Sequence, residues 1–309
     1  MTIVIGTLNR RELLQGSLVS LLRQRCPADR FEILVVDNGS TDGTQEMVRR
    51  LAAAASNMRL VEEPARGLSH ARNRGIAEAR GRLVAFFDDD AVAEPDWVEV
   101  LLGVFEREPE TDAAGGRIEV LWPDQRPLWM PRSIEGYYGL CDYGRERKRL
   151  AYPQYPFGSN MVIRRERLLA IGGFNTELGP TGGNLMAGGE QDLFFRLYRT
   201  DITIVYEPAA LVHHWAPPER VTKRWTRRRA FRHGISNATM AYWNGTTGPR
   251  AWAGRLALAV WRCANGAAAT ATAVLGRAAP DIVVARSTTT LYWAGIARGA
   301  VSNAFRRAH

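Results

Sequence analysis

The sequence has 309 residues, of which 46% are hydrophobic and 24% charged, a composition typical of folded globular proteins that excludes a wholly disordered chain. Its net charge of +9 indicates an anionic partner, such as a nucleotide or an acidic membrane surface. No nucleic-acid-binding motif accompanies that charge, so we expect no nucleic-acid partner.

The first hundred residues alternate between short apolar runs and segments with helical periodicity. Predicted strands cover residues 3–5, 31–37, 58–62 and 82–88, and predicted helices cover 12–23, 44–55 and 69–79. Continuous apolar strands separated by helices are typical of a parallel sheet that is covered on both faces. The predicted fold class is therefore α/β.

The remainder of the chain is less regular. Pro95 is predicted to begin a helix, whereas residues 107–156 are rich in Pro, Gly, Trp and Tyr and are predicted to be irregular or edge-strand structure. Further predicted elements are a strand at 157–163, a helix at 164–170, a glycine-rich loop at 179–189, a helix from about 190 and a strand at 202–208. From about residue 219 onward the pattern predicts mostly helix.

Polar residues follow three of the predicted strands. Thr7 and Asn9 come after the first, Asp37 ends the second, and the triplet Asp88 to Asp90 follows the fourth. Open parallel sheets bind ligands beyond the carboxyl ends of their strands. We therefore expect these side chains to gather at one edge of the sheet.

The aspartate triplet has two interpretations. Adjacent carboxylates repel one another, and a cation such as Mg²⁺ or Mn²⁺ would allow them to stay ionised and to bind phosphate oxygens. An acidic loop or a helix N-cap explains the same residues without a ligand. The triplet alone does not decide between a metal site and a turn.

Five other residues carry similar alternatives. Asp37 is either an ordinary turn former or a hydrogen-bond acceptor for a base or ribose. Glu190 and Asp192 either compensate the charge of a helix N-terminus or supply a general base. His213 and His214 follow a strand, and one of them is either a core histidine or a metal ligand. Neither GxGxxG nor GxxxxGK is present, which argues against a dinucleotide fold and a P-loop.

The C-terminal region begins with a strongly basic segment, RVTKRWTRRRAFR at residues 220–232. A solvated helix face explains this charge, and so does contact with phosphate or with an anionic membrane surface. The tryptophans of the region are either packed within a helical appendage or placed at a membrane interface, and they are Trp225, Trp252, Trp261 and Trp293.

Three widely spaced cysteines without a CxxC pair indicate neither a zinc site nor a disulfide framework. They predict a reducing, cytoplasmic setting. The N-terminus is not expected to be a signal peptide, and no run approaches about 18 uninterrupted apolar residues, so no spanning helix is expected. We predict a cytoplasmic protein with peripheral attachment to the cytoplasmic face of a membrane; the sequence does not indicate its oligomeric state.

Six segments, taken together and in this order, resemble glycosyltransferase family 2, the inverting enzymes of the GT-A type. They cover most of residues 2–233. The matching stretches are VIGTLNR, EILVVDNGSTDGT, GLSHARNRGIAEARGRLVAFFDDD, FGSNMVIRRERLLAIGGFN, GGEQDLFFRLYR and YEPAALVHHWAPPER.

We predict a transferase domain at 1–218, made of a nucleotide-sugar half (1–106) and an acceptor half (107–218), followed by a helical region at 219–309 that associates with a membrane. The family resemblance weakens in this last region. For the transferase domain it implies a GT-A type, Rossmann-like, mostly parallel sheet flanked by helices, which the C-terminal helical extension follows. It further implies a nucleotide-diphosphate sugar as donor, Mn²⁺ or Mg²⁺ as cofactor, and a hydroxyl acceptor in a glycan, glycolipid or lipid-linked intermediate. The transferred group would be a hexosyl or deoxyhexosyl unit.

The resemblance also implies roles for individual residues. The implied nucleotide-sugar contacts are Thr7, Asn9, Arg10, Asp37, Arg72, Asp88 and Asp89. Asp88 and Asp90 match the outer positions of the DxD motif, with Asp90 as the direct metal ligand and Asp88 facing the ribose or the metal. His214 matches a histidine that completes the metal site in some relatives.

The implied catalytic base lies in the stretch Gly189-Glu190-Gln191-Asp192. The family commonly has two acidic residues, any residue and a further acid here, and this chain has glycine at the first position. Glu190 then falls on the base position, with Asp192 in reserve. The competing functions are a non-catalytic sugar-nucleotide or glycan-binding protein on the same fold, and a nucleotidyltransferase, for which VIGTLNRRE is a poor phosphate loop.

Overall fold

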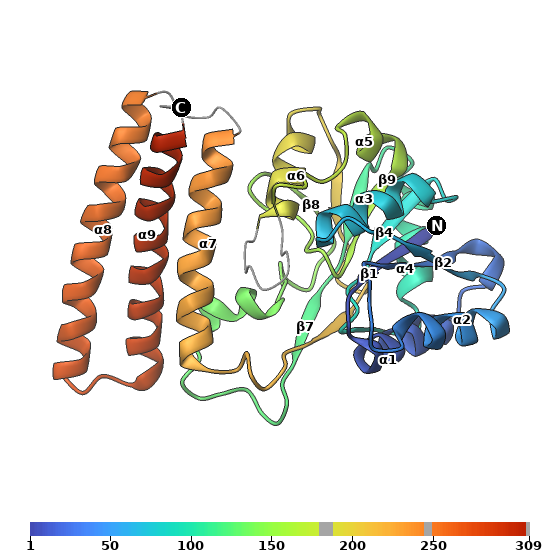
Figure 1. Ribbon diagram of the computed structural model, residues 1–309, viewed down its shortest axis with the longest axis horizontal. Helices are drawn as coiled ribbons and strands as arrows, with labels where there is room; N and C mark the ends of the chain where they lie inside the picture. The colour runs from blue at the N-terminus through green and yellow to red at the C-terminus, as the bar shows by residue number, and fades with distance from the viewer. Residues whose placement is uncertain (179–187, 244–248, 307–309) are drawn as a thin grey trace. The chain divides into compact units, whose positions relative to one another are not determined.

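The computed structural model describes residues 1–178, 188–243 and 249–306 (Figure 1). The glycine-rich loop predicted at 179–189 therefore lies largely outside the described residues, as does the side chain of Trp252. The described residues form two compact units, one made of 1–121, 139–178 and 189–215, the other mainly of 122–138 and 216–306. The domain boundary at residue 218 stays a prediction.

The first unit is built on an eight-stranded sheet with the order β3-β2-β1-β4-β9-β6-β10-β8. Its strands are β1 (Thr2–Thr7), β2 (Glu32–Asp37), β3 (Met58–Glu62), β4 (Leu83–Phe86), β6 (Ala113–Gly115), β8 (Lys148–Leu150), β9 (Met161–Arg164) and β10 (Ile204–Tyr206). Within this described sheet β9 and β8 run antiparallel to their neighbours and the remaining pairings are parallel. The predicted mostly parallel sheet is confirmed.

Alternate residues of the central strands enter two different cores, because successive side chains of a strand point to opposite faces. Ile3 and Ile5 pack in one core, with side chains from α1 (Arg11–Leu22), α2 (Thr44–Ala54) and α4 (Trp97–Arg107). Val4 packs in the other, with α3 (Leu68–Glu78), α5 (Arg165–Ala170) and α6 (Gly189–Tyr198). Helices thus cover both faces (Figure 1), which explains the continuously apolar strands.

Residues 107–156 differ from their prediction. The strand β6, of sequence AAG, lies in the interior of the sheet between β9 and β10, so the expectation of irregular or edge structure is wrong for it. Three small residues carry too weak a pattern to distinguish a buried strand from a loop. The strand β8 is at the sheet edge as expected, and a short helix spans Arg132–Tyr138.

A second, three-stranded sheet has the order β5-β11-β7, with β5 at Ala91–Ala93, β11 at Val212–Trp215 and β7 at Ile118–Leu121. The strand β5 follows the aspartate triplet directly and pairs antiparallel with β11, with His214 opposite Ala91. This pairing brings two segments that are far apart in the sequence to the same place.

The second unit contains the helices α7 (Lys223–Trp243), α8 (Pro249–Leu275) and α9 (Pro280–Arg306). The helix α9 packs against both α7 and α8 (Figure 1). Its approach to α7 requires glycine, because a Cβ on Gly295 would lie 2.0 Å from the carbonyl oxygen of Phe231. None of the helices in the described residues is both long enough and apolar enough to cross a membrane.

Candidate functional site

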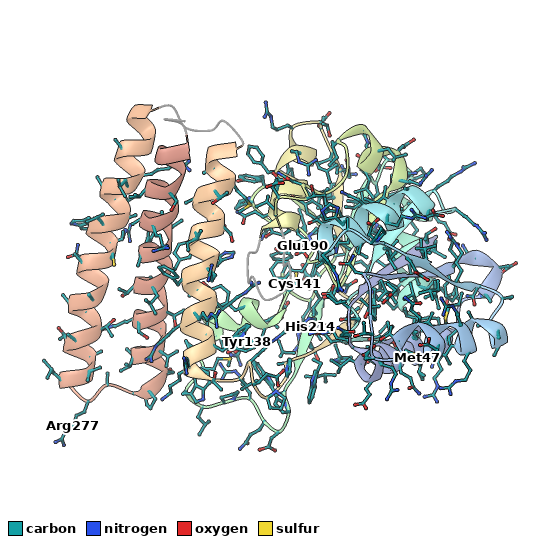
Figure 2. The ribbon with its side chains drawn as sticks, viewed as in Figure 1. Met47, Tyr138, Cys141, Glu190, His214 and Arg277 are labelled. Atoms are coloured by element: carbon teal, nitrogen blue, oxygen red, sulfur yellow. The ribbon has the colours of Figure 1, made fainter. Side chains whose placement is uncertain are left out.

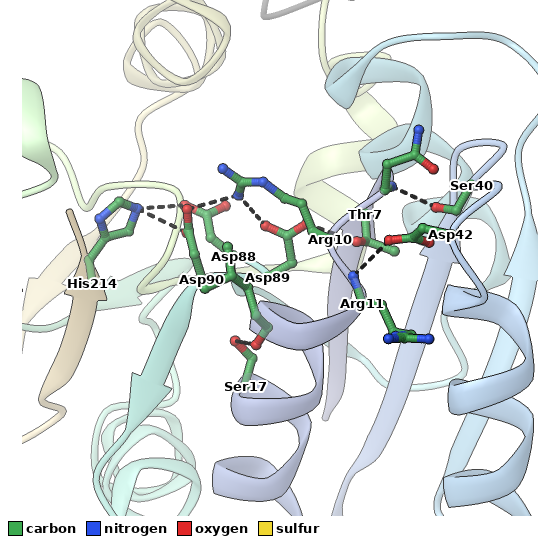
Figure 3. Close-up of polar contacts among 12 residues, drawn as sticks. Thr7, Arg10, Arg11, Ser17, Ser40, Asp42, Asp88, Asp89, Asp90 and His214 are labelled. Carbon is green, nitrogen blue, oxygen red and sulfur yellow. Dashed lines mark hydrogen bonds and ion pairs between the residues drawn. The ribbon is translucent and has the colours of Figure 1, made fainter. Parts of the chain in front are cut away.

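The end of β4 and the strand β11 place three potential metal ligands together (Figure 3). His214 Nε2 lies 3.2 Å from Asp90 Oδ1 and 3.8 Å from Asp88 Oδ2, and the ligand atoms of the three residues lie within 4.8 Å of one another. The backbone N–H of Trp215 donates to the carbonyl oxygen of Asp90 at 2.9 Å. The β5–β11 pairing therefore holds the histidine beside the aspartates.

Asp89 turns to a different set of partners. Its carboxylate accepts a hydrogen bond from the hydroxyl of Thr7 at 2.8 Å and one from Arg10 Nη1 at 2.6 Å. The same Arg10 nitrogen lies 2.8 Å from Asp90 Oδ2 (Figure 3). Thr7, Arg10 and Asp89 thus form a network that ties the first strand to the triplet.

Burial makes the negative charge of this cluster costly. It raises the pKa of the Asp88 carboxyl above its usual value and that of Asp89 to about 6, although Arg72 and Arg10 oppose the two shifts. A cation between Asp88 and Asp90 would favour their ionised forms. Two carboxylates and an imidazole are donors that fit a divalent cation such as Mn²⁺ or Mg²⁺.

Arg72 connects the aspartate cluster to Glu190. Its Nη2 lies 3.3 Å from Asp88 Oδ1, and its Nη1 donates to Glu190 Oε1 at 2.9 Å. The guanidinium is buried, with its Cζ 5.9 Å from the centre of the Phe86 ring and 5.2 Å from that of Phe174. The aromatic rings and the two carboxylates fix the guanidinium, which in turn orients the Glu190 side chain.

Glu190 and Asp192 differ in accessibility. The Glu190 side chain is 30% exposed, whereas that of Asp192 is 3% exposed and pairs with Arg196 at 2.8 Å. Arg196 also donates to the carbonyl oxygens of Ile171 and Gly173. Asp192 therefore stabilises the turn before Phe174, whereas the Glu190 carboxylate is accessible to solvent. Glu190 and His214 are both labelled in Figure 2.

Asp37 and Asn9 hold the loops after the first two strands. The buried Asp37 carboxylate accepts hydrogen bonds from the backbone N–H of Ser40 and from Gln45 Nε2 at 2.7 Å. Asn9 Oδ1 accepts from the N–H of Thr41 at 2.7 Å. The structure thus shows the turn-forming role of Asp37, and the nucleotide contacts implied for Asp37 and Asn9 stay predictions.

Two glycines of the site were missed by sequence reasoning. A Cβ on Gly158 would lie 2.0 Å from Glu190 Oε1 and 2.5 Å from Arg72 Nη2. Gly139, at φ +99°, lies against the ring of His214, where a Cβ would be 3.0 Å away. A glycine within a predicted strand often marks a close approach, so FGSNMVI did contain a signal for Gly158. No comparable signal existed for Gly139.

Replacing Gly158 by Ala is expected to displace the ends of the Glu190 and Arg72 side chains and to weaken their ion pair, which lowers the free energy of unfolding by about 1 kcal/mol. Urea denaturation would measure the loss. Gly16→Ala is the matched control, because Gly16 is exposed in α1 with nothing near its Cβ position, and alanine favours helix. Equal stability of the Gly158→Ala variant and the wild type would contradict the close packing.

The sequence is similar to a known protein family and to individual relatives. The model of the family described as glycosyl transferase family 2 matches residues 2–171. The chain is 31% identical over 176 residues to the glucosyl-dolichyl phosphate glucuronosyltransferase of Haloferax volcanii, a match that covers 57% of this chain and 56% of that protein. It is 28% identical over 236 residues to the succinoglycan biosynthesis protein ExoM of Rhizobium meliloti, covering 75% and 72%. The chain thus spans little more than half the length of the first relative.

Solved structures share the fold. The mannosyltransferase PcManGT from Pyrobaculum calidifontis, in complex with GDP-Man and Mn²⁺, is similar with a TM-score of 0.62 and 24% identity over 99% of this chain and 87% of that one. TarS of S. aureus in complex with UDP-GlcNAc gives a TM-score of 0.57 at 15% identity, over 100% and 92%. These similarities confirm the GT-A type architecture predicted from the sequence.

Proposed function

Because the chain belongs to glycosyl transferase family 2, we propose that it transfers a sugar from a nucleotide-diphosphate donor to an acceptor hydroxyl, with inversion and with a divalent cation. The observation that carries the proposal is the cluster of Asp88, Asp90 and His214 at the end of β4, joined to an accessible Glu190 through Arg72. A diphosphate site and a general base are the two components that such a transfer requires.

The donor is proposed to bind across the carboxyl ends of β1, β2 and β4. Thr7, Asn9 and Arg10 belong to the loop after β1, and Asp37 ends β2, so nucleotide contacts from these residues are consistent with their positions. The nucleotide sugars in the PcManGT and TarS structures, and the Mn²⁺ in the former, support a donor and cofactor of the same classes.

Asp90, His214 and Asp88 are proposed to hold the cation. When bound, the cation neutralises the negative charge that develops on the leaving diphosphate. Thr7 and Arg10 hold Asp89, and through it the triplet, in position. Asp89 is thereby a positioning residue in this proposal rather than a ligand.

Glu190 is proposed to accept the proton of the acceptor hydroxyl. The acceptor oxygen forms a bond to the anomeric carbon from the face opposite the diphosphate, while the bond from that carbon to the diphosphate oxygen breaks. The nucleotide diphosphate leaves with the electron pair of that bond. Because the acceptor attacks from the opposite face, the configuration at the anomeric carbon is inverted. Arg72 orients the Glu190 carboxylate, and Asp192, bound to Arg196, supports the neighbouring turn.

The acceptor is proposed to be a glycan, a glycolipid or a lipid-linked intermediate. The names of the glucosyl-dolichyl phosphate enzyme and of the succinoglycan protein ExoM support these classes. A lipid-linked acceptor would place the enzyme at the cytoplasmic face of a membrane, where it would associate peripherally.

Screening nucleotide diphosphates and nucleotide sugars by thermal unfolding tests the proposal. A ligand at about 100 times its Kd stabilises the folded state by about 2.7 kcal/mol, which raises the Tm measurably. We expect at least one nucleotide to raise the Tm with Mn²⁺ and to lose most of this effect with EDTA. A panel in which no nucleotide gives a cation-dependent shift would refute the proposed donor class.

A further inference from the structure

The helix α8 presents an unusually apolar surface. The side chain of Trp261 is 59% exposed and that of Leu275 is 84% exposed, and Leu258, Val260 and Val274 are also exposed. The opposite side of α8 packs on α9, with Ala259 and Ala273 buried. Large apolar groups at one surface mark sites of interaction more often than scattered ones do.

Six exposed residues share one face of the helix. They recur every three or four positions, as one face of a helix requires, and they are Ala257, Trp261, Ala264, Ala268, Ala271 and Leu275. The run from Cys263 to Gly276 contains no charged residue. We name this surface, made of the six residues above with Val260 and Val274, the outer face of α8.

The charge around this face is strongly positive. Residues 216–309 contain 15 Lys and Arg against two Asp and Glu, a net of +13, and because the whole chain carries +9, residues 1–215 carry −4. The helix α8 has arginine at 250, 255 and 262 and no acidic residue. Arg277 projects from the turn that follows α8 (Figure 2). An apolar helix face on a strongly cationic region is suited to an anionic lipid surface.

We propose that the outer face of α8 binds an anionic membrane surface, with the helix lying in the plane of the interface. The uncharged run of α8 would extend about 21 Å at 1.5 Å per residue, less than the ~30 Å hydrocarbon core, so the helix lies on the bilayer. This inference rests on the proposed function in one respect: attachment to a membrane would bring the enzyme to the proposed lipid-linked acceptor.

Trp261 and Arg262 form a pair suited to the interface. The Arg262 guanidinium lies over the rings of Trp261 and Trp293, at 5.5 and 5.7 Å from their centres. Tryptophan favours the boundary between headgroups and acyl chains, and an adjacent arginine reaches lipid phosphates. Trp261 and Arg262 would therefore contribute an apolar contact and an electrostatic contact to membrane binding at the same place.

Two side chains of the basic segment at 220–232 pack within the second unit. Trp225 packs against Tyr138 with ring centres 5.1 Å apart, and Arg227 donates to Ser287 at 3.1 Å. These side chains support the second unit itself. The basic segment then contributes its charge to the attraction, whereas α8 supplies the apolar contact.

A second copy of the chain fits the outer face less well than lipid does. Two copies joined through the outer face would bring together two regions, residues 216–309 of each, that both carry a net charge of +13, without an acidic residue on either α8 to offset the repulsion. Anionic headgroups complement the same positive charge.

Flotation of the full chain with vesicles tests the proposal. Vesicles of phosphatidylcholine with about one third phosphatidylglycerol supply the anionic surface, and pure phosphatidylcholine is the neutral comparison. We expect the wild type to bind the anionic vesicles, and the double variant Trp261→Ser, Leu275→Ser to bind about tenfold more weakly or less. Leu128→Ser is the matched control, since Leu128 is 92% exposed but lies outside α8; it should bind as the wild type does.

Three results would overturn the inference: a wild type that does not float with anionic vesicles at low salt, a double variant that floats equally well, or a dimer in analytical ultracentrifugation that the double variant abolishes. The flotation contains neither donor nor cation. A protein that does not float but binds nucleotide with Mn²⁺ would therefore count against the membrane surface alone. A protein that floats but does not bind nucleotide with Mn²⁺ would count against the proposed transfer alone.

Discussion

The variant Glu190→Gln is expected to lose sugar transfer by about 10²–10⁴-fold while its affinity for the nucleotide stays unchanged. The amide oxygen of glutamine can still accept the hydrogen bond of Arg72 Nη1, so the geometry around the guanidinium is preserved. The amide cannot accept a proton at neutral pH, so the acceptor hydroxyl is not activated. Steady-state kinetics and calorimetry with the nucleotide would separate these two effects.

Two further variants sharpen this test. Glu166→Gln, at an exposed position of α5, is the matched control and should behave as the wild type does. Asp192→Asn should chiefly lower stability, because it weakens a buried pair with Arg196. Turnover near the wild-type rate in Glu190→Gln, together with loss in a folded Asp192→Asn, would reverse the roles proposed for the two carboxylates.

Asp90→Ala is expected to remove the dependence of nucleotide binding on Mn²⁺ and to weaken binding in its presence by about a hundredfold. Asp90 contributes one of the three clustered donors, and its carboxylate is buried beside the other two. Calorimetry with and without Mn²⁺ measures the effect directly. The residual binding without Mn²⁺ should match that of the wild type under the same conditions.

Because Asp90 also pairs with Arg10, its loss disturbs the loop after β1 as well. His214→Gln provides the independent check, since His214 is a donor of the same cluster that comes from a different strand, β11. Both variants should lose the Mn²⁺ dependence. If His214→Gln retains it fully, the imidazole is not part of the cation site.

The first half of the fold was predictable because its strands are buried on both faces. Such strands are continuously apolar, and the helices between them have clear periodicity, so the predicted elements up to Glu78 agree with the structure within about two residues. The rule that parallel strands end at one edge then placed Thr7, Asp37 and the triplet near one another. For these residues the hydrophobic pattern of the sequence and the topology of a parallel sheet were sufficient to predict the structure.

Contacts between distant segments were not predictable from local patterns. The antiparallel pairing of β5 with β11 decides that His214, 124 residues beyond Asp90, lies beside it, and both strands are short. The same holds for the pairing of Arg72 with Glu190. Only the resemblance to a family assigned Arg72, Glu190 and His214 to one site, and it did so without indicating that Arg72 binds Glu190.

The pairing of β5 with β11 also has a consequence for the order in which the protein is made. On the ribosome, the aspartates emerge long before the histidine that completes their cluster. A nascent chain that has folded only through β4 offers two carboxylates with no imidazole beside them. The complete three-donor set therefore exists only after β11 has been synthesised and has paired with β5, so the proposed cation could bind all three donors only in a first unit that has already been assembled.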